Sequence, residues 1–222
     1  MSRASTPFSH LGRAAYCPRQ LYYAEQRDDQ EPPSEVKRTR NLAFRYDELL
    51  TADNDELDRL PLAVTPETYR ANLERLTARD DWAELANPTD REVFLRGRDC
   101  HGTAHKILDT DPPTPTVISP GSPPDRGVWE PQRVRAVAVA KAVAWERERE
   151  IPRALVEYPA HGVVRTVRLT TRNTGAYRRT LWTVRQMEGV PSRVRDSSKC
   201  AACEYQTSCG TKTRSLKSLL GL

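Results

Sequence analysis

The chain has 222 residues, of which 29% are charged and 37% are apolar, and its formal net charge is +5. This composition is polar for a globular protein but leaves enough apolar surface for one core, so we expect one domain, or one domain with a small appended module. No apolar run approaches the ~20 residues that a membrane-spanning helix needs, and the N-terminus lacks signal-peptide features, so we expect no membrane contact and a cytoplasmic location.

The first half of the chain is predicted to be helical. Residues 5–27 begin with Ser9, which can cap a helix, and Pro18 interrupts the apolar pattern. A proline inside a helical pattern breaks it, so this segment predicts a helix, a break and a second helix. A polar linker is predicted after it, over residues 28–35. Three helices are predicted next, over 37–50, 66–79 and 89–109, and the last of them opens at Thr89.

The next segment is rich in proline. Residues 110–131 hold seven of the 17 prolines, so neither a helix interior nor a central strand fits there, apart from a short strand over 116–118. An Ala- and Val-rich helix is then predicted over residues 132–150. A hairpin of two β-branched strands follows over 153–159 and 163–169, and a last helix over 173–188. Gly189 ends that helix, before a cysteine-rich segment and a basic tail.

Five cysteines in a chain expected to be intracellular argue against a disulfide scaffold and for metal or redox chemistry. Three of them form a C-x2-C-x5-C triplet, at Cys200, Cys203 and Cys209. Thiolates are soft ligands that favour zinc or an iron–sulfur centre, and either centre needs a fourth ligand. Cys17 and Cys100 are the candidates for that fourth position.

The surroundings of Cys17 resemble a known motif. Residues 15–23 read A-Y-C-P-R-Q-L-Y-Y. Paired with the C-terminal triplet, this segment is similar to the CRISPR-associated exonuclease family of the Cas-four type, whose relatives include the AddB-type helicase–nucleases. In that family one N-terminal and three C-terminal cysteines hold a [4Fe–4S] cluster that joins the two ends of the domain. The resemblance therefore implies a [4Fe–4S] cofactor bound by Cys17, Cys200, Cys203 and Cys209.

A zinc knuckle is the alternative to the cluster. It would use the last three cysteines and a local fourth ligand, but Glu204 is the only histidine or acidic residue within the triplet. The pattern at both ends of the chain favours the cluster. Cys100 is then expected to be a small core residue on a helix.

The resemblance also implies ligands for a catalytic metal. Residues 96–101 read R-G-R-D-C-H and are similar to the family's G-x-x-x-H helix, in which the histidine helps to bind the metal. His101 is therefore one candidate ligand, and His105, one helical turn further on, is the other. Gln132 matches by position the glutamine of the family's Q-x-x-x-Y helix, although no tyrosine follows at the expected spacing.

The carboxylates of the family's catalytic site have no clear counterpart. In the family, an Asp on one strand and a Glu-x-Lys on the next hold Mg²⁺ or Mn²⁺ and activate the attacking water. Residues 116–121 occupy that place and read T-V-I-S-P-G. Glu157 opens an E-Y-P segment, but Pro159 stands where the lysine should be, and the segment follows the glutamine helix instead of preceding it. Three other aspartates lie nearby without a convincing strand: Asp109, Asp111 and Asp125.

Basic residues are concentrated toward the C-terminus. Residues 1–150 have a net charge of −4, whereas residues 151–222 have a net charge of +9, and 29 of the 35 basic residues are arginine. The planar guanidinium group binds phosphate through two parallel hydrogen bonds, so this composition indicates contact with a polyanion. Arg178 and Arg179, on the last predicted helix, are the candidate nucleic-acid ligands.

The resemblance implies an α/β fold of the PD-(D/E)XK restriction-endonuclease-like class, a small mixed sheet flanked by helices. A single RecB-like domain would span residues 1–222, with residues 1–30 and 195–212 as the cluster-binding module. Two functions follow. In the first, the protein binds DNA, single-stranded as in the family, with CRISPR-adaptation or DNA-repair proteins as further partners and a degenerate nuclease centre. In the second, it is an active exonuclease that uses Mg²⁺ or Mn²⁺.

Overall fold

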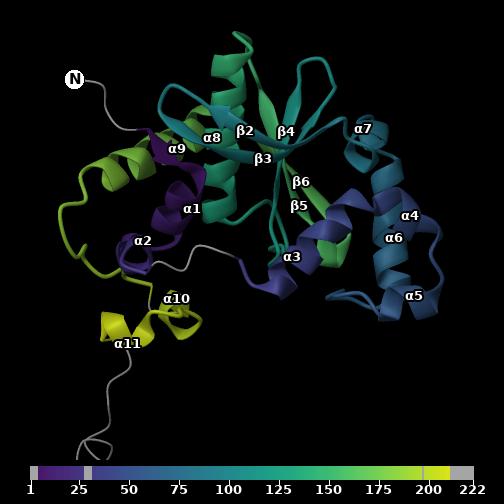
Figure 1. Ribbon diagram of the computed structural model, residues 1–222, viewed down its shortest axis with the longest axis horizontal. Helices are drawn as coiled ribbons and strands as arrows, with labels where there is room; N and C mark the ends of the chain where they lie inside the picture. Colours follow the sequence, from purple (N-terminus) through teal and green to yellow (C-terminus); the bar gives the residue numbers. More distant parts are fainter. Residues whose placement is uncertain (1–4, 28–31, 197, 211–222) are drawn as a thin grey trace, which may run out of the picture.

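A mixed sheet of six strands forms the centre of the molecule, with helices on both faces (Figure 1). The computed structural model describes residues 5–27, 32–196 and 198–210. The strands are β1 Thr6–Pro7, β2 Asp90–Arg96, β3 Cys100–Leu108, β4 Thr114–Ile118, β5 Arg153–Tyr158 and β6 Val163–Arg168. Their order is β1-β3-β4-β5-β6, and β2 also pairs with β3. The pairs β1–β3 and β4–β5 are parallel and the others are antiparallel, so the fold is α/β with a mixed sheet.

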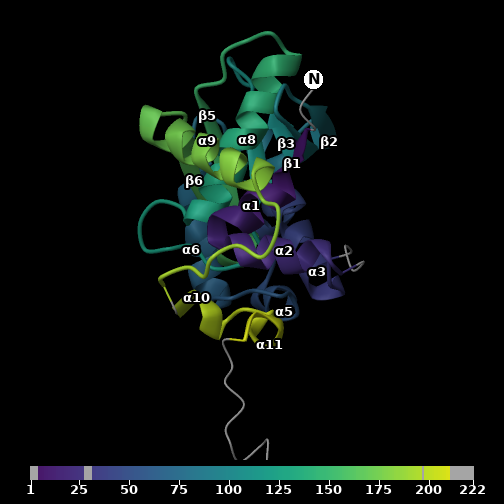
Figure 2. The same ribbon diagram turned by 90° about the vertical axis from the view of Figure 1, so that its left-hand side faces the viewer.

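Two groups of helices cover the sheet (Figures 1 and 2). The first group packs on one face and contains α1 Phe8–Tyr16, α8 Glu130–Glu146 and α9 Thr171–Arg185. The second group packs on the opposite face and contains α4 Tyr46–Thr51, α5 Asn54–Asp58, α6 Pro66–Thr77 and α7 Trp82–Ala86. The remaining helices are α2 Pro18–Glu25, α3 Ser34–Asn41, α10 Ser198–Ala201 and α11 Gln206–Cys209, with 3₁₀ turns at Leu42–Phe44 and Pro159–His161.

Helix α8 is the centre of the first core. It connects the parallel strands β4 and β5, a connection that needs a crossover element such as a helix. It also contacts α1 and α9, and eight of its 17 residues are buried, because an alanine- and valine-rich helix has apolar side chains all round. A β-carbon on Gly97 would lie 2.8 Å from the Cα atom of Ala142. The turn between β2 and β3 therefore packs directly on this helix.

The second core contains a fully buried ion pair. The Nζ atom of Lys106 on β3 lies 2.8 Å from Oε2 of Glu157 on β5, and both side chains have no solvent exposure. Thr116 donates a hydrogen bond of 2.6 Å to the other carboxylate oxygen. The Lys106 ammonium also donates to the backbone oxygens of Ala43 and Leu85. These contacts satisfy both charges. Glu157, the carboxylate of the E-Y-P segment, therefore links β5 to β3 and β4, and Lys106 extends the link to the backbone at Ala43 and Leu85.

The helix predicted over residues 89–109 is wrong. This segment forms the antiparallel strands β2 and β3, with Arg96 opposite His101. The polar turn between them closes with a hydrogen bond of 2.9 Å from the Gly97 amide to the Cys100 carbonyl. A spacing of four residues fits one face of a strand as well as one face of a helix, so the histidine spacing did not distinguish the two. Cys100 is buried in the core as predicted, but on β3.

Several other predicted elements are confirmed with small shifts at their ends. They are the helix–break–helix over 5–27, the helices over 66–79 and 173–188, and the hairpin over 153–169, which correspond to α1 and α2, α6, α9, and β5 with β6. The predicted strand over 116–118 is also confirmed as part of β4. That strand starts two residues earlier and includes Pro115, which pairs with Ile107 of β3 but has no partner position on β5. A proline is tolerated there because no ladder hydrogen bond is lost on the second side.

Three predicted boundaries differ from the structure. Ser9 lies inside α1, and Pro7 occupies the N-cap position. The helix predicted over 37–50 is divided into α3, a 3₁₀ turn and α4. The helix predicted over 132–150 ends at Glu146. No helix within the described residues is long and apolar enough to cross a membrane.

Candidate metal centre and basic surfaces

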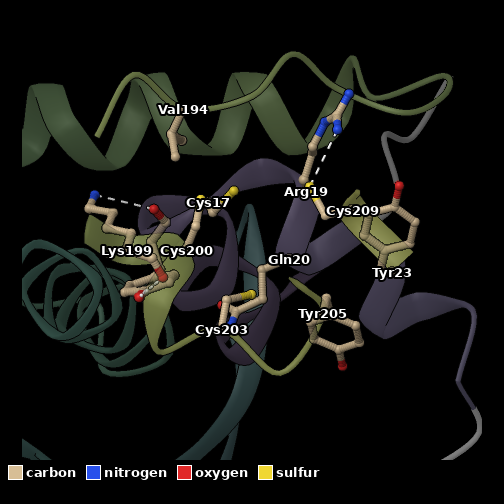
Figure 3. Close-up of a pocket in the computed structure, with 11 residues that line it drawn as sticks. Cys17, Arg19, Gln20, Tyr23, Val194, Lys199, Cys200, Cys203, Tyr205 and Cys209 are labelled. Carbon is tan, nitrogen blue, oxygen red and sulfur yellow. Dashed lines mark hydrogen bonds between the residues drawn. The ribbon is translucent and has the colours of Figure 1, made fainter. Parts of the chain in front are cut away.

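The four predicted cluster ligands line one pocket, formed by both ends of the chain (Figure 3). Cys17 lies between α1 and α2, Cys200 lies in α10, Cys209 ends α11, and Cys203 lies in the turn between these two short helices. The predicted module over 1–30 and 195–212 falls partly outside the described residues, which omit 1–4, 28–31, 197 and 211–222. Within the described part, the segments predicted to meet do meet.

A proline-induced break positions Cys17. Its backbone is extended, with φ −161° and ψ 121°, although helices flank it on both sides. Pro18 disfavours the helical conformation in the residue before it and starts α2 at a position where no amide donor is needed. The Cys17 amide still donates to the Arg13 carbonyl of α1, and its carbonyl accepts from the Gln20 amide of α2. Cys17 therefore forms the corner between the two helices, and its thiol lines the pocket.

Tight turns position the other three cysteines. The Cys203 amide donates to the Cys200 carbonyl at 3.2 Å, and the Cys209 amide donates to the Tyr205 carbonyl at 2.8 Å. Gly210 ends α11 in the left-handed conformation, with φ 66°, which favours glycine. Arg193 donates to the carbonyls of Cys209 and Gly210, and so ties this turn to the loop after α9.

Direct contacts join the two ends of the chain beside the cysteines. The Tyr16 hydroxyl donates to the Lys199 carbonyl at 2.7 Å, and the Lys199 ammonium donates to the Tyr16 carbonyl at 3.2 Å. The rings of Tyr23 and Tyr205 stack with their centres 6.2 Å apart. Figure 3 shows Lys199 on one side of the cysteine pocket, and Tyr23 and Tyr205 on the other. The contacts hold α10 and α11 against α1 and α2.

The ionisable groups in the pocket favour a positively charged ligand. Burial raises the pKa of the Cys203 thiol, and the nearby thiols of Cys17 and Cys200 raise it further, because thiolates repel one another. Arg19 donates a hydrogen bond of 3.3 Å to the Cys209 sulfur, and this bond raises the pKa of the guanidinium group. A bound metal ion would favour the thiolate form of these cysteines, because a nearby positive charge stabilises the anion.

Two kinds of metal centre use cysteine thiolates, a single zinc ion and an iron–sulfur cluster. Among the described residues, no group of three or more His, Cys, Asp or Glu side chains is placed to hold a single ion. A tetrahedral zinc site would need its sulfurs about 3.8 Å apart, given a zinc–sulfur bond of about 2.3 Å. A cluster of four irons accepts thiolates set further apart, and four thiolates are its usual ligands. The cavity measures about 20 Å³, little more than one water needs, so the cysteines as placed leave no room for a cluster, and binding one would require the surrounding side chains to move outward.

Among the described residues, those predicted to form a nuclease centre do not come together as ligands of a catalytic metal ion. His101 lies on β3, with its Nδ1 atom 3.0 Å from the Ser5 hydroxyl and its ring beside Phe94. His105 is buried, and its Nδ1 atom accepts a hydrogen bond from the Ile118 amide at 3.1 Å. Burial, followed by Arg135 and other nearby cations, lowers the pKa of His105 well below its usual range, so the ring is neutral. The lone pair of Nδ1, which could bind a metal ion, is therefore already engaged by the Ile118 amide.

The acidic residues near this region are engaged elsewhere or are not gathered. Glu157 forms the buried pair with Lys106, and Asp111 forms an ion pair with Arg149. In the part of the chain that the structure describes, no carboxylates join His101 in a metal-holding group. Gln132 donates a hydrogen bond of 3.2 Å to the Ser119 hydroxyl. The structure therefore shows no cage for a catalytic ion around the predicted residues.

Helices α8 and α9 present a basic surface with exposed aromatic side chains. Arg178 and Arg179 are both exposed on α9. Arg178 borders a cavity of about 380 Å³, together with Arg98, Lys141 and Trp145. Trp145 is 56% exposed, and Trp182, one turn after Arg178, is 67% exposed.

The acidic residue at this cavity, Asp99, is already paired with Arg185 at 3.0 Å. Within the described segments, Arg98 and Arg178 form no ion pair. The tryptophans were missed at the sequence level, although each follows a cation by four residues on its helix: Lys141 with Trp145, and Arg178 with Trp182.

Comparisons with known proteins do not assign this chain to a family. No protein-family model matches it, and a search of curated protein sequences finds no match. The assignment of a function therefore depends on the residues and on the geometry described above.

Proposed function

We propose that this protein is an iron–sulfur DNA-binding protein that resembles CRISPR-associated exonucleases of the Cas-four type but has a degenerate nuclease centre. The observation that carries the proposal is the single pocket in which Cys17 meets Cys200, Cys203 and Cys209. These residues come from opposite ends of the chain, and nothing in the core packing requires four thiols there. We further propose that the α/β fold belongs to the PD-(D/E)XK-like class, with the cysteine pocket as its closing module.

The proposed cofactor is a [4Fe–4S] cluster held by these four cysteines, which supplies a structural crosslink when bound. The chain's own residues support that role. Cys17 is presented by a rigid corner between two helices, and the Tyr16–Lys199 and Tyr23–Tyr205 contacts bring the C-terminal segment to it. Arg19 donates to the Cys209 sulfur, the kind of hydrogen bond that stabilises a coordinated thiolate.

The proposed nucleic-acid surface is the face of α8 and α9 around Arg98, Lys141 and Arg178, with Trp145 and Trp182. Cations along such a surface follow the phosphate backbone, and exposed aromatic rings stack on bases. Bases are free to stack on side chains only where the strand is unpaired, so this combination favours single-stranded DNA. Arg179 lies next to Arg178 and extends the basic surface along α9.

We propose that the isolated protein does not hydrolyse DNA, because its described residues form no anionic cage for Mg²⁺ or Mn²⁺. These ions prefer several oxygen ligands, and no such group surrounds His101 among the residues described. An active exonuclease of the same family remains the second candidate function. The resemblance of residues 96–101 and Gln132 to the family's motifs is the observation that favours it.

The experiment that tests the cluster is anaerobic purification followed by visible spectroscopy and iron and sulfide analysis. We expect a brown protein with a broad visible absorbance, and we expect Cys203→Ser to lose both iron and stability, since cluster binding is coupled to folding. Cys100→Ser is the matched control, because Cys100 is buried in the sheet core, away from the pocket; it should keep its iron. A colourless protein with one stoichiometric zinc would contradict the proposal.

A further inference from the structure

A second pocket lies where α1, α3, β4 and α8 meet, and three arginines line it. It measures about 260 Å³, far more than one water needs. Arg13 comes from α1, Arg40 from α3 and Arg135 from the second turn of α8. Ser119 and Gln132 also line it. Three cations from three separate helices converge here, which local sequence does not explain.

The three guanidinium groups have no protein partner in the described part of the structure. None of them forms an ion pair or a side-chain hydrogen bond there, in contrast to arginines such as Arg79 and Arg153, which both contact Asp81. The Nε atoms of Arg40 and Arg135 are buried without any hydrogen-bond acceptor. Buried donors in native proteins nearly always have a partner. Arg133, Arg165 and Arg185 also have a buried Nε atom without an acceptor, but they do not line this pocket. Two such donors on arginines that converge beside one open pocket point to an acceptor that comes from outside the chain.

The surroundings of the pocket leave its positive charge largely uncompensated. Burial, followed by the nearby Arg40, lowers the pKa of Arg135 to about 10, so the group is still charged at neutral pH. Glu92 on β2 is the acidic residue that acts on both arginines, but it forms no ion pair with either among the described residues. His105 lies behind them as a neutral ring. An anion bound between the arginines would relieve the repulsion.

We infer that this pocket binds a phosphate group. Guanidinium groups hold phosphate oxygens through paired hydrogen bonds, and a phosphate carries enough oxygens and charge to engage three arginines together. The Ser119 hydroxyl and the Gln132 amide supply neutral polar contacts at the rim. The phosphate has two possible sources, the 5′ end of a DNA strand and free phosphate. The first source rests on the proposed DNA-binding function, whereas phosphate binding itself does not.

The test uses the full chain as purified and three probes: inorganic phosphate, and a single-stranded oligonucleotide with either a 5′-phosphate or a 5′-hydroxyl. Phosphate should raise the thermal midpoint by about 2–4 °C compared with chloride of equal ionic strength. Arg135→Gln and Arg40→Gln should each abolish that shift. Arg59→Gln is the matched control, because Arg59 is exposed at the end of α5, and it should keep the full shift. Circular dichroism and the visible spectrum report whether each variant is folded.

The oligonucleotides identify the source. If the strand end is the ligand, the 5′-phosphorylated strand should bind about tenfold more tightly than the 5′-hydroxyl strand, and Arg135→Gln should remove the difference. If both strands bind equally while phosphate still stabilises the protein, free phosphate is the ligand.

Arg135→Lys keeps the charge and should keep part of the phosphate shift. A wild-type protein without any phosphate shift, or an equal loss in Arg59→Gln, would overturn the inference. Phosphate binding by a protein that lacks iron and binds no DNA would refute only the proposed function.

Discussion

At the scale of single residues, the Lys106–Glu157 pair shows how a motif-like segment can have a structural role. Glu157 is an acidic residue on a strand, which is where a catalytic carboxylate is expected. Its partners are the Lys106 ammonium and the Thr116 hydroxyl, and none of the three side chains reaches solvent. A group that is fully satisfied and inaccessible to substrate cannot activate water. Its contribution is to the stability of the fold.

The buried pair leads to a stability prediction. Glu157→Gln leaves the Lys106 charge uncompensated in the core, which typically costs about 3–5 kcal/mol of unfolding free energy. Glu48→Gln is the matched control, because Glu48 forms an exposed pair with Arg45. Exposed pairs are typically worth about 0–1 kcal/mol. Urea unfolding of the three proteins measures both changes, and equal losses would show that the buried pair has no special role.

At the scale of elements, the sequence could predict the helices better than the sheet. The break at Pro18, the hairpin and α6 follow from proline, glycine and apolar spacing, which act within a few residues. The strands β2 and β3 were missed, because their charged residues and the four-residue spacing of His101 and His105 also fit a helix. Their conformation is fixed by long-range contacts with α8, such as the approach of Gly97 to Ala142, which no local pattern reveals.

The same distinction applies to the candidate sites. The cysteines could be predicted because their spacing is itself the signal. The arginine pocket could not, since Arg13, Arg40 and Arg135 are far apart in a sequence that contains 29 arginines. Only the packing of α1, α3 and α8 distinguishes them from the others.

The basic surface of α9 leads to a prediction about salt. Arg178→Gln combined with Arg179→Gln should weaken single-stranded DNA binding by about the same factor for unrelated sequences, because phosphate contacts carry no base information. The slope of log K against log salt should fall in magnitude by about 1.4, from about 0.7 for each lost phosphate contact. Fluorescence anisotropy over a salt series measures both. Unchanged affinity at low salt would mean that α9 presents only a solvated surface.

Stacking on the same surface should behave differently. Trp182→Ala should lose about 1–3 kcal/mol of DNA-binding free energy, the usual worth of one stacked base, without changing the salt slope. Trp129→Ala is the control, because Trp129 is similarly exposed, at 53%, but precedes α8 at its opposite end from Trp145. A larger effect at Trp129 would place the DNA on another face of the molecule.

At the scale of the whole molecule, the cysteine pocket lies apart from the two apolar cores of the sheet, since none of its lining residues belongs to either core. The Tyr16–Lys199 hydrogen bond joins residues 183 positions apart, so a cluster at this place closes almost the whole chain into a loop. Closing a long loop removes much of the entropy of the unfolded chain. The sheet and its two cores need no such closure, since their buried residues all precede the cysteine triplet.

This separation leads to the prediction about catalysis. Phosphodiester hydrolysis in metal-dependent nucleases of the family that the sequence resembles needs carboxylates that hold a metal ion beside the scissile phosphate. The strand β4, where Glu-x-Lys is expected, presents Thr116, Val117 and Ile118, none of which ionises. His101 contacts a serine and an aromatic ring, which cannot retain Mg²⁺. We therefore expect no metal-dependent degradation of single-stranded DNA by the anaerobically purified protein.

His101→Ala tests the same conclusion at the residue that the resemblance singles out. The substitution should leave iron content and DNA affinity nearly unchanged, because His101 lies outside both the cysteine pocket and the proposed DNA surface. A nuclease assay with Mn²⁺, run on the wild-type protein and on this variant, gives a direct answer. Strong Mn²⁺-dependent degradation that His101→Ala abolishes would contradict the degenerate site. It would require carboxylates to move next to His101 on β3 when DNA binds.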